Sequence, residues 1–189
     1  MGGMEARVKF RELNADEIEC RVGTVSQKGT GLSLLLYKDA RCDARILDET
    51  VGPENWQCEF YEQKGTLFCK VGIAFDKWVA DAGGREFQAQ KWVWKSDAGA
   101  PSNMEAQKGE ASDAFKRACF KWGIGRELYT APFIWVPQGC CEIVQQQNGK
   151  YTSYDRFEVA KVAIEDGRLV GIRIVNAKNG QVAFSWREE

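Results

Sequence analysis

The chain has 189 residues and a formal net charge of −1, and 44% of its residues are hydrophobic and 28% charged. This composition is typical of a globular protein with one well-filled core and excludes wholesale disorder. The near-neutral charge excludes nucleic-acid binding through bulk positive charge, whereas a local basic groove is compatible with it.

The residue types limit the chemistry further. The sequence contains no histidine, so neither a Ser-His-Asp nor a Cys-His nucleophile can form. The seven cysteines show no CxxC spacing, and we expect reduced thiols in a cytoplasmic core. No apolar run suits a transmembrane helix, and the N-terminus lacks the apolar region of a secretory signal. A Walker-type phosphate loop is absent, so we expect neither ATP-driven strand exchange nor any cofactor.

The N-terminal part is predicted to contain two helices with a strand between them. Asn14 and Glu17 have the spacing of a capping box, which predicts a helix over residues 10–23 that ends at Gly23. The apolar run LSLLLYKDA is suited to a buried strand. The segment ARCDARILDETVG returns to helical spacing and ends at a Gly-Pro step.

Three strands are predicted next, at residues 57–62, 66–76 and 86–95. The connections QKGT and DAGG have turn chemistry, so the strands form an antiparallel meander. In the second strand, strict alternation places five apolar residues on one face, namely Leu67, Cys69, Val71, Ile73 and Phe75.

A helix follows the meander. Ser102 and Glu105 have capping-box spacing before it, and Gly123 and Gly125 are stop signals after it. Helical spacing gives one apolar stripe, made of Ala111, Ala114, Phe115, Ala118, Cys119 and Trp122. We therefore predict a βββα unit with this stripe packed on one face of the sheet.

The C-terminal part is predicted to be β-rich. Asp-Gly and Asn-Gly turns separate three apolar runs at residues 156–165, 169–176 and 181–186, which indicates an antiparallel meander. The stretch GCCEIVQQQNGKY before it is expected to be irregular. The prediction is an α+β fold in one domain over 1–189, with a core at about 10–137 and a C-terminal β-hairpin extension at about 138–189.

Basic side chains of the long helix are candidates for a nucleic-acid site. Lys116, Arg117 and Lys121 point away from the apolar stripe. Lysine and arginine in a groove neutralise phosphates without reading sequence. The alternative is a structural oligomer in which this basic face is only solvated.

The strand QKWVWK before the helix adds to these candidates. Alternation places Lys91 and Lys95 on one face and Trp92 and Trp94 on the other. The tryptophans either stack bases or belong to the core, and the sequence leaves both open.

A metal-dependent nuclease is a second alternative. Asp76, Asp81, Glu86 and Lys91 lie on or beside one predicted hairpin, where they could surround a divalent ion. Their spacing matches no nuclease pattern, and surface turns are often acidic.

The segment KGEASDAFKRACFKWGIGRELY, with YKDARCDARILDETVGPENWQCEFYE upstream, resembles the single-strand DNA annealing proteins of the Rad fifty-two superfamily, and in particular their phage and prophage members. The shared skeleton is a Tyr-x-Asp-Ala-Arg segment, Leu-Asp-x-x-x-Gly with a Trp, three strands, and an Ala-Ser-Asp-Ala-x-Lys-Arg-Ala helix. The resemblance covers roughly residues 13–137.

The resemblance implies a meander and helix that assemble into homo-oligomeric rings or filaments. A basic groove then holds the backbone of single-stranded DNA and leaves the bases free to pair. Lys116 and Arg117 match the paired basic residues of the groove-floor helix. Arg41, or its immediate neighbour, matches a basic residue of the earlier helix. Lys108 matches another basic residue, which lies one helical stretch before the Lys116–Arg117 pair. Phe120 departs from the eukaryotic pattern, which has an arginine there.

The implied role is ATP-independent annealing in homologous recombination and DNA repair, without enzymatic activity. The implied partners are single-stranded DNA and further copies of the chain, with an exonuclease and a single-strand binding protein as further candidates and no membrane. The implied location is the cytoplasm of a bacterial or phage-infected cell. The long recombinase-recruiting tail of eukaryotic members is not in this sequence, so we expect annealing alone.

Overall fold

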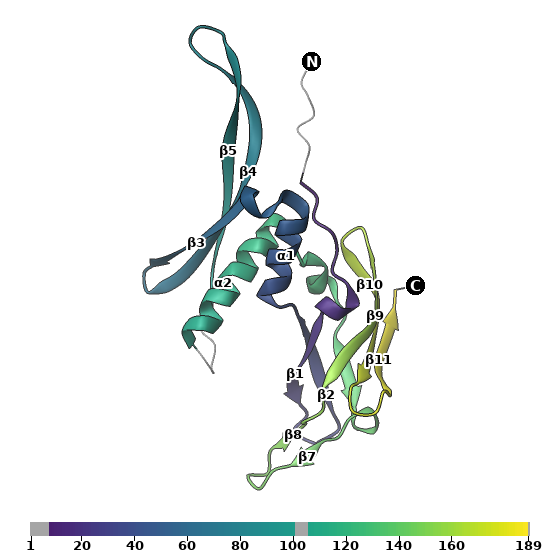
Figure 1. The fold of residues 1–189 in the computed structure, drawn as a ribbon. Helices are drawn as coiled ribbons and strands as arrows, with labels where there is room; N and C mark the ends of the chain where they lie inside the picture. Colours follow the sequence, from purple (N-terminus) through teal and green to yellow (C-terminus); the bar gives the residue numbers. More distant parts are fainter. Residues whose placement is uncertain (1–7, 101–105, 189) are drawn as a thin grey trace. The chain divides into compact units, whose positions relative to one another are not determined.

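The computed structural model describes residues 8–100 and 106–188, without the side chains of residues 78 and 106–108. Within that description the chain is α+β, with mostly antiparallel strands and two α-helices (Figure 1). It divides into two compact units: unit 1 contains residues 1–11 and 40–124, and unit 2 contains residues 12–39 and 125–189.

A three-stranded antiparallel sheet, in the order β3–β4–β5, is the base of unit 1 in the part of the chain described. All three predicted strands are present, and they are longer than expected: β3 spans Trp56–Gln63, β4 spans Thr66–Ala80 and β5 spans Glu86–Ala98. β3 pairs only with the first half of β4. Beyond it, β4 and β5 continue as a two-stranded arm (Figure 1).

The helix α2, Ala106–Trp122, packs against β4 and β5 through the predicted stripe. Ala114, Phe115, Ala118 and Cys119 are buried, and they meet the buried face of β4, which includes Val71. The tryptophan at the end of the helix is also anchored, because its indole Nε1 donates to the Val71 carbonyl at 2.9 Å.

Glycine ends α2, as predicted. Gly123 has a φ of 114°, so the chain can turn back on the helix. The amides of Gly123 and Ile124 donate to the carbonyls of Phe120 and Cys119, which is a Schellman motif. The capping box predicted at the start of this helix lies outside the described residues.

The helix α1, Ala40–Val51, packs on α2 and matches the second predicted helix. Cys42, Ile46 and Leu47 are buried. Gly52, with a φ of 85°, ends the helix and leads into a short 3-10 helix, η2, at Pro53–Asn55.

Unit 2 is built, over its described residues, on a six-stranded antiparallel sheet in the order β11–β10–β9–β1–β2–β6. The strands are β1 Glu19–Val25, β2 Gly31–Tyr37, β6 Ile134–Pro137, β9 Phe157–Glu165, β10 Arg168–Asn176 and β11 Val182–Arg187. The C-terminal meander is present as predicted. Its pairing with the N-terminal strands, through Glu19 opposite Glu158, was not predicted.

Short elements complete unit 2. Three of them are 3-10 helices: η1 at Ala15–Glu17, η3 at Arg126–Thr130 and η4 at Gln138–Cys140. The segment expected to be irregular contains a small hairpin, with β7 at Val144–Gln145 paired to β8 at Tyr151–Thr152. None of the helices in the described residues is both long and apolar enough to cross a membrane.

The prediction of a helix over residues 10–23 is wrong. The capping signal is real, since Glu17 Oε2 accepts from the Asn14 amide at 2.9 Å, but it supports only the single turn η1. From Ile18 on, apolar and polar residues alternate, and the chain enters β1. Pairing with β2 therefore overrides the local helix signal, and Gly23 lies within a strand.

Candidate nucleic-acid interface

Three of the predicted basic residues come together where the C-terminal half of α2 meets β5. Arg117 and Lys121 lie beside Asp97 there, and Lys95 contacts the end of α2 next to them; we call these four residues the basic corner. The distance to Asp97 Oδ2 is 3.6 Å from Arg117 Nη2 and 3.6 Å from Lys121 Nζ. Lys95 and Asp97 reach this position because they lie opposite Val71 and Cys69 of β4, on the face that α2 covers.

The lysines of the basic corner are fixed by backbone contacts. Lys95 Nζ donates to the Lys121 carbonyl at 2.9 Å and lies 4.5 Å from the centroid of the Trp122 ring. Lys121 Nζ donates to the Ser96 carbonyl at 2.7 Å. An ammonium group at the last carbonyls of a helix also favours the helix dipole. Lys95 thus both stabilises the end of α2 and adds positive charge beside it.

The remaining charge of the corner faces solvent. The side chains of Arg117 and Lys121 are 49% and 47% exposed, and that of Asp97 is 20% exposed. Ion pairs this exposed contribute only about 0.2–1 kcal/mol. The corner contains three cations and one carboxylate, so it has an excess of positive charge that a phosphate group can approach.

The other predicted residues lie elsewhere in unit 1. Lys116 is half-buried and five residues before Lys121, which places it about 140° around the axis of α2, on the other flank of the helix. Lys91 is exposed opposite Phe75, in the β4–β5 arm. Arg41 is exposed in the first turn of α1. Lys108 belongs to α2, and its side chain is outside the described atoms.

Two residues of this region were missed by the sequence reasoning. Asp97 follows Lys95 by two residues, so strand alternation alone places both on one face. Arg45 follows Arg41 by four residues on α1, and both side chains are exposed. Residues four apart lie on the same side of a helix, so this spacing was the available signal.

The tryptophans of β5 lie on the face of the sheet opposite α2. Trp94 pairs with Gly72 and Trp92 with Ala74, whereas the lysines on either side of them face α2, so the predicted separation of lysines from tryptophans is confirmed. Both rings are half-buried and stack with their centroids 5.9 Å apart. Lys70 Nζ lies 4.6 Å from the Trp94 ring centroid. The rings are thus not part of the core under α2.

The acidic residues of the nuclease alternative are spread along the arm. Asp76 and Glu86 lie on the same face of the arm, but Asp76 pairs with Gln90 and Glu86 pairs with Ala80. The two carboxylate positions are therefore offset by four residues, or about 13 Å, along the strands. Asp81 Oδ1 instead accepts from the amides of Gly83 and Arg85, both at 2.9 Å, and shapes the turn. Among the described residues, no group of three or more cysteine or acidic side chains could hold a metal.

All seven cysteines are free thiols, but only four of them are buried in the expected way, and Cys58 differs most from that expectation. It is exposed on β3, and a hydrogen bond from the Cys69 thiol lowers the pKa of Cys58 to about 7 against the opposing effect of burial. The same hydrogen bond, followed by burial, raises the pKa of Cys69. Burial also raises the pKa of Cys20 to about 12.

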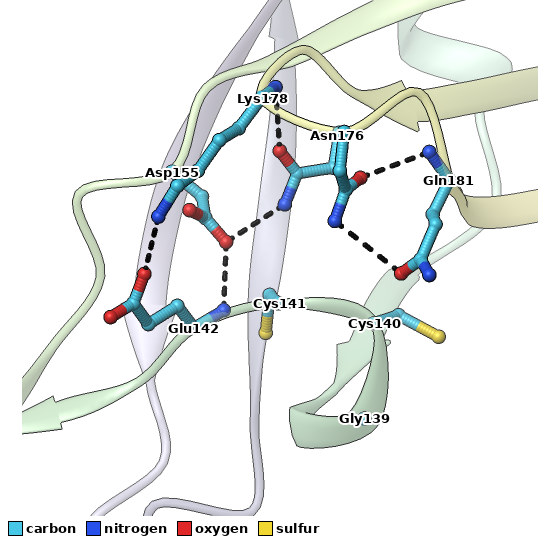
Figure 2. Close-up of a pocket in the computed structure, with 9 residues that line it drawn as sticks. Gly139, Cys140, Cys141, Glu142, Asp155, Asn176, Lys178 and Gln181 are labelled. Carbon is cyan, nitrogen blue, oxygen red and sulfur yellow. Dashed lines mark hydrogen bonds and ion pairs between the residues drawn. The ribbon is translucent and has the colours of Figure 1, made fainter.

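Unit 2 contains a separate polar cavity of about 400 Å³, which Figure 2 shows in close-up. Asp155 Oδ2 accepts from the Glu142 amide at 2.7 Å and from Asn176 Nδ2 at 2.8 Å. Lys178 Nζ lies 2.8 Å from Glu142 Oε2, and this contact raises the pKa of Lys178. The polar side chains that line the cavity therefore bind one another, and their contacts connect the turn after β10 to the segment after η4.

Comparison with known proteins identifies one family. The family model described as Rad52/22 family double-strand break repair protein matches residues 9–146, well over half of the chain. No curated protein and no solved structure matches the chain. The matched range includes all of the basic corner, both helices and the sheet of unit 1.

Proposed function

Because the chain belongs to the Rad52/22 family of double-strand break repair proteins, we propose that it binds single-stranded DNA and anneals complementary strands without ATP. Family membership itself assigns the chain to DNA repair and recombination. The observation that supports the annealing activity is the basic corner, where cations are held in place beside a rigid helix and sheet.

Annealing is opposed by the mutual repulsion of two phosphate backbones and by structure within each single strand. Lysine and arginine side chains offset the repulsion, and they do so without contacting bases. No proton transfer is required, which agrees with the lack of histidine. The residues proposed to contact the backbone are Lys116, Arg117 and Lys121, with Arg41, Lys91, Lys95 and Lys108 as further contacts.

We extend the proposal to assembly. A single chain has a net charge of −1 and only a few cations in the basic corner, so its own affinity for a strand is expected to be low. Linked copies multiply weak contacts, because the second contact becomes intramolecular. The active form is therefore a homo-oligomer, a ring or filament built on the meander and α2, in which residues 1–189 act as one annealing domain.

The site is tested by changing Lys116→Ala together with Arg117→Ala. Loss of two phosphate contacts should weaken binding to a single strand at least tenfold at moderate salt. It should also reduce the slope of log affinity against log salt by about 1.4, since each contact to a single strand contributes about 0.7. Fluorescence anisotropy over a salt series and an annealing assay measure both effects.

The matched control is Lys150→Ala with Arg156→Ala, an exposed lysine and arginine in unit 2 that remove the same charge. Equal losses in both double variants would show that only total charge matters. Wild-type annealing by the α2 variant would refute the site. Oligomers without affinity for any nucleic acid at low salt would favour a structural role instead, and cleavage of labelled DNA with magnesium or manganese would favour a nuclease.

A further inference from the structure

The outward face of the unit 2 sheet carries large apolar side chains. Phe133 is 75% exposed, Leu35 is 48% exposed and Trp135 is 38% exposed. Pairing places Leu35 opposite Arg21 and Trp135 opposite Ser33, so residues of β1, β2 and β6 share this face. We call it the aromatic face, and it consists of Arg21, Leu35, Tyr37, Phe133 and Trp135.

The large apolar side chains of the aromatic face are not part of the core of unit 2. The alternate residues of the same strands, Leu32, Leu34, Ile134 and Val136, point the other way and are buried. The solvent side of an antiparallel sheet is ordinarily polar. Adjacent large apolar side chains on that side are typical of a surface that binds another molecule.

The rings of the aromatic face are already positioned. Phe133 and Trp135 stack with centroids 6.4 Å apart and planes 21° apart. Trp135 lies directly over Gly31, where an added Cβ would come within 2.5 Å of the indole ring. Arg21 Cζ is 4.7 Å from the centroid of the Tyr37 ring. Aromatic rings and a guanidinium plane are the groups on which nucleobases stack.

The charge of the same sheet face suits a polyanion. Arg173 and Lys161 are paired, exposed residues of β10 and β9, and Arg173 points away from the buried Ile172 and Ile174. With Arg21 they give three cations on this side of the sheet, against the carboxylates of Glu19 and Glu158. Arg21, beside the Tyr37 ring, adds positive charge at the aromatic face itself, and Lys161 and Arg173 add charge further along the same side of the sheet.

We propose that the aromatic face of unit 2 is a second single-stranded DNA contact, which binds unpaired bases by stacking. In this proposal unit 1 supplies phosphate contacts and unit 2 supplies base contacts. The choice of DNA as ligand rests on the proposed annealing function, whereas the stacking chemistry rests on the rings themselves. A second copy of the chain is the competing occupant, and the experiment separates the two.

The test compares two ligands of equal length, oligothymidylate and an abasic strand with the same phosphates and no bases. Phe133→Ala should weaken binding of oligothymidylate roughly 5- to 150-fold and leave binding of the abasic strand unchanged. Phe133→Tyr keeps a ring and should keep the affinity, whereas Phe133→Leu stays apolar and should behave like the alanine variant. Tyr154→Ala removes an equally exposed ring, at 76%, outside the aromatic face and should change neither affinity.

Each outcome decides the proposal. Equal losses for both ligands, no loss for either, or full affinity in Phe133→Leu would overturn base stacking. If Phe133→Ala changed the oligomer mass in the absence of DNA and left the affinity ratio intact, the face would be a contact between copies. The variant Lys116→Ala with Arg117→Ala should weaken both ligands equally, so failure of the phosphate site is distinguished from failure of the stacking site.

Discussion

In the proposed DNA site, Asp97 is the residue that sets how the basic corner receives a phosphate group. It lies 3.6 Å from both Arg117 and Lys121, and its Oδ1 accepts from the Ala98 amide at 2.8 Å. The carboxylate keeps two long side chains in one place before DNA arrives. It also repels a phosphate that approaches the same cations. Asp97 therefore lowers the affinity of the corner for a phosphate while it orders the side chains of Arg117 and Lys121.

Asp97→Asn should tighten binding to single-stranded DNA about threefold to tenfold at low salt, because the isosteric amide removes one negative charge at the corner and keeps an oxygen for the Ala98 amide. The advantage should shrink as salt is raised. Binding isotherms at several salt concentrations measure it.

Glu59→Gln is the matched control for this change. Glu59 also pairs with a lysine of the same unit, Lys70 at 3.0 Å, but on the side of the sheet opposite α2. A similar gain in this control, or weaker binding by Asp97→Asn, would contradict a specific role for Asp97.

The elements of unit 1 follow from local pattern, whereas β1 does not. Alternation around Cys69 and Val71 and the stripe on α2 predicted both elements, because each buries one face against the other. The segment around Glu17 carries a helix signal that is satisfied by one turn. The residues that follow form a strand because they pair with β2 and with β9. β9 starts more than a hundred residues later, and no local signal in the sequence indicates such pairing.

The candidate site shows the same limit. Helical spacing identified Lys116, Arg117 and Lys121 as outward-facing, and this holds for the described helix. That Lys121 and Lys95 meet across the end of α2 depends on how the helix crosses β5, which spacing within one element cannot report. The same crossing brings Asp97 between the cations.

Gly72 is required by the packing of the outward sheet face of unit 1. A Cβ at this position would come within 2.7 Å of the Trp94 ring. Gly72→Ala should therefore lower the free energy of unfolding by about 1–3 kcal/mol, as overpacked sites do. Gly139→Ala, where a Cβ meets no atom within 4 Å, should change it little. Urea unfolding measures both variants, and equal stabilities would show that the Trp94 ring moves aside at no cost.

At the scale of the whole molecule, neither unit is a continuous stretch of chain. The polypeptide passes from one unit to the other after residues 11, 39 and 124. Unit 2 in particular combines the N-terminal β1–β2 hairpin with strands from the last third of the chain. Its core includes Leu32 and Leu34 together with Phe157, Leu169 and Ile174.

A chain truncated after residue 137 should lose the cooperative folding of unit 2. Truncation removes β9, β10 and β11, half of the strands in the sheet, and exposes the free side of β1. Residues 12–39 should then become sensitive to protease while unit 1 keeps its protected helices. Limited proteolysis with mass spectrometry checks this, and an intact, protected β1–β2 hairpin in the truncated chain would contradict it.

The interleaving of the units also sets an order of events on the ribosome. β1 and β2 emerge early and can pair with each other at once, but their outer edges must wait for β9 and β6. At about 5–20 residues per second, the wait between Val25 and Phe157 is on the order of ten seconds. During that interval two unpaired strand edges are open to other nascent chains. For a chain proposed to act as a homo-oligomer, this interval is an opportunity for premature self-association before its own sheet is complete.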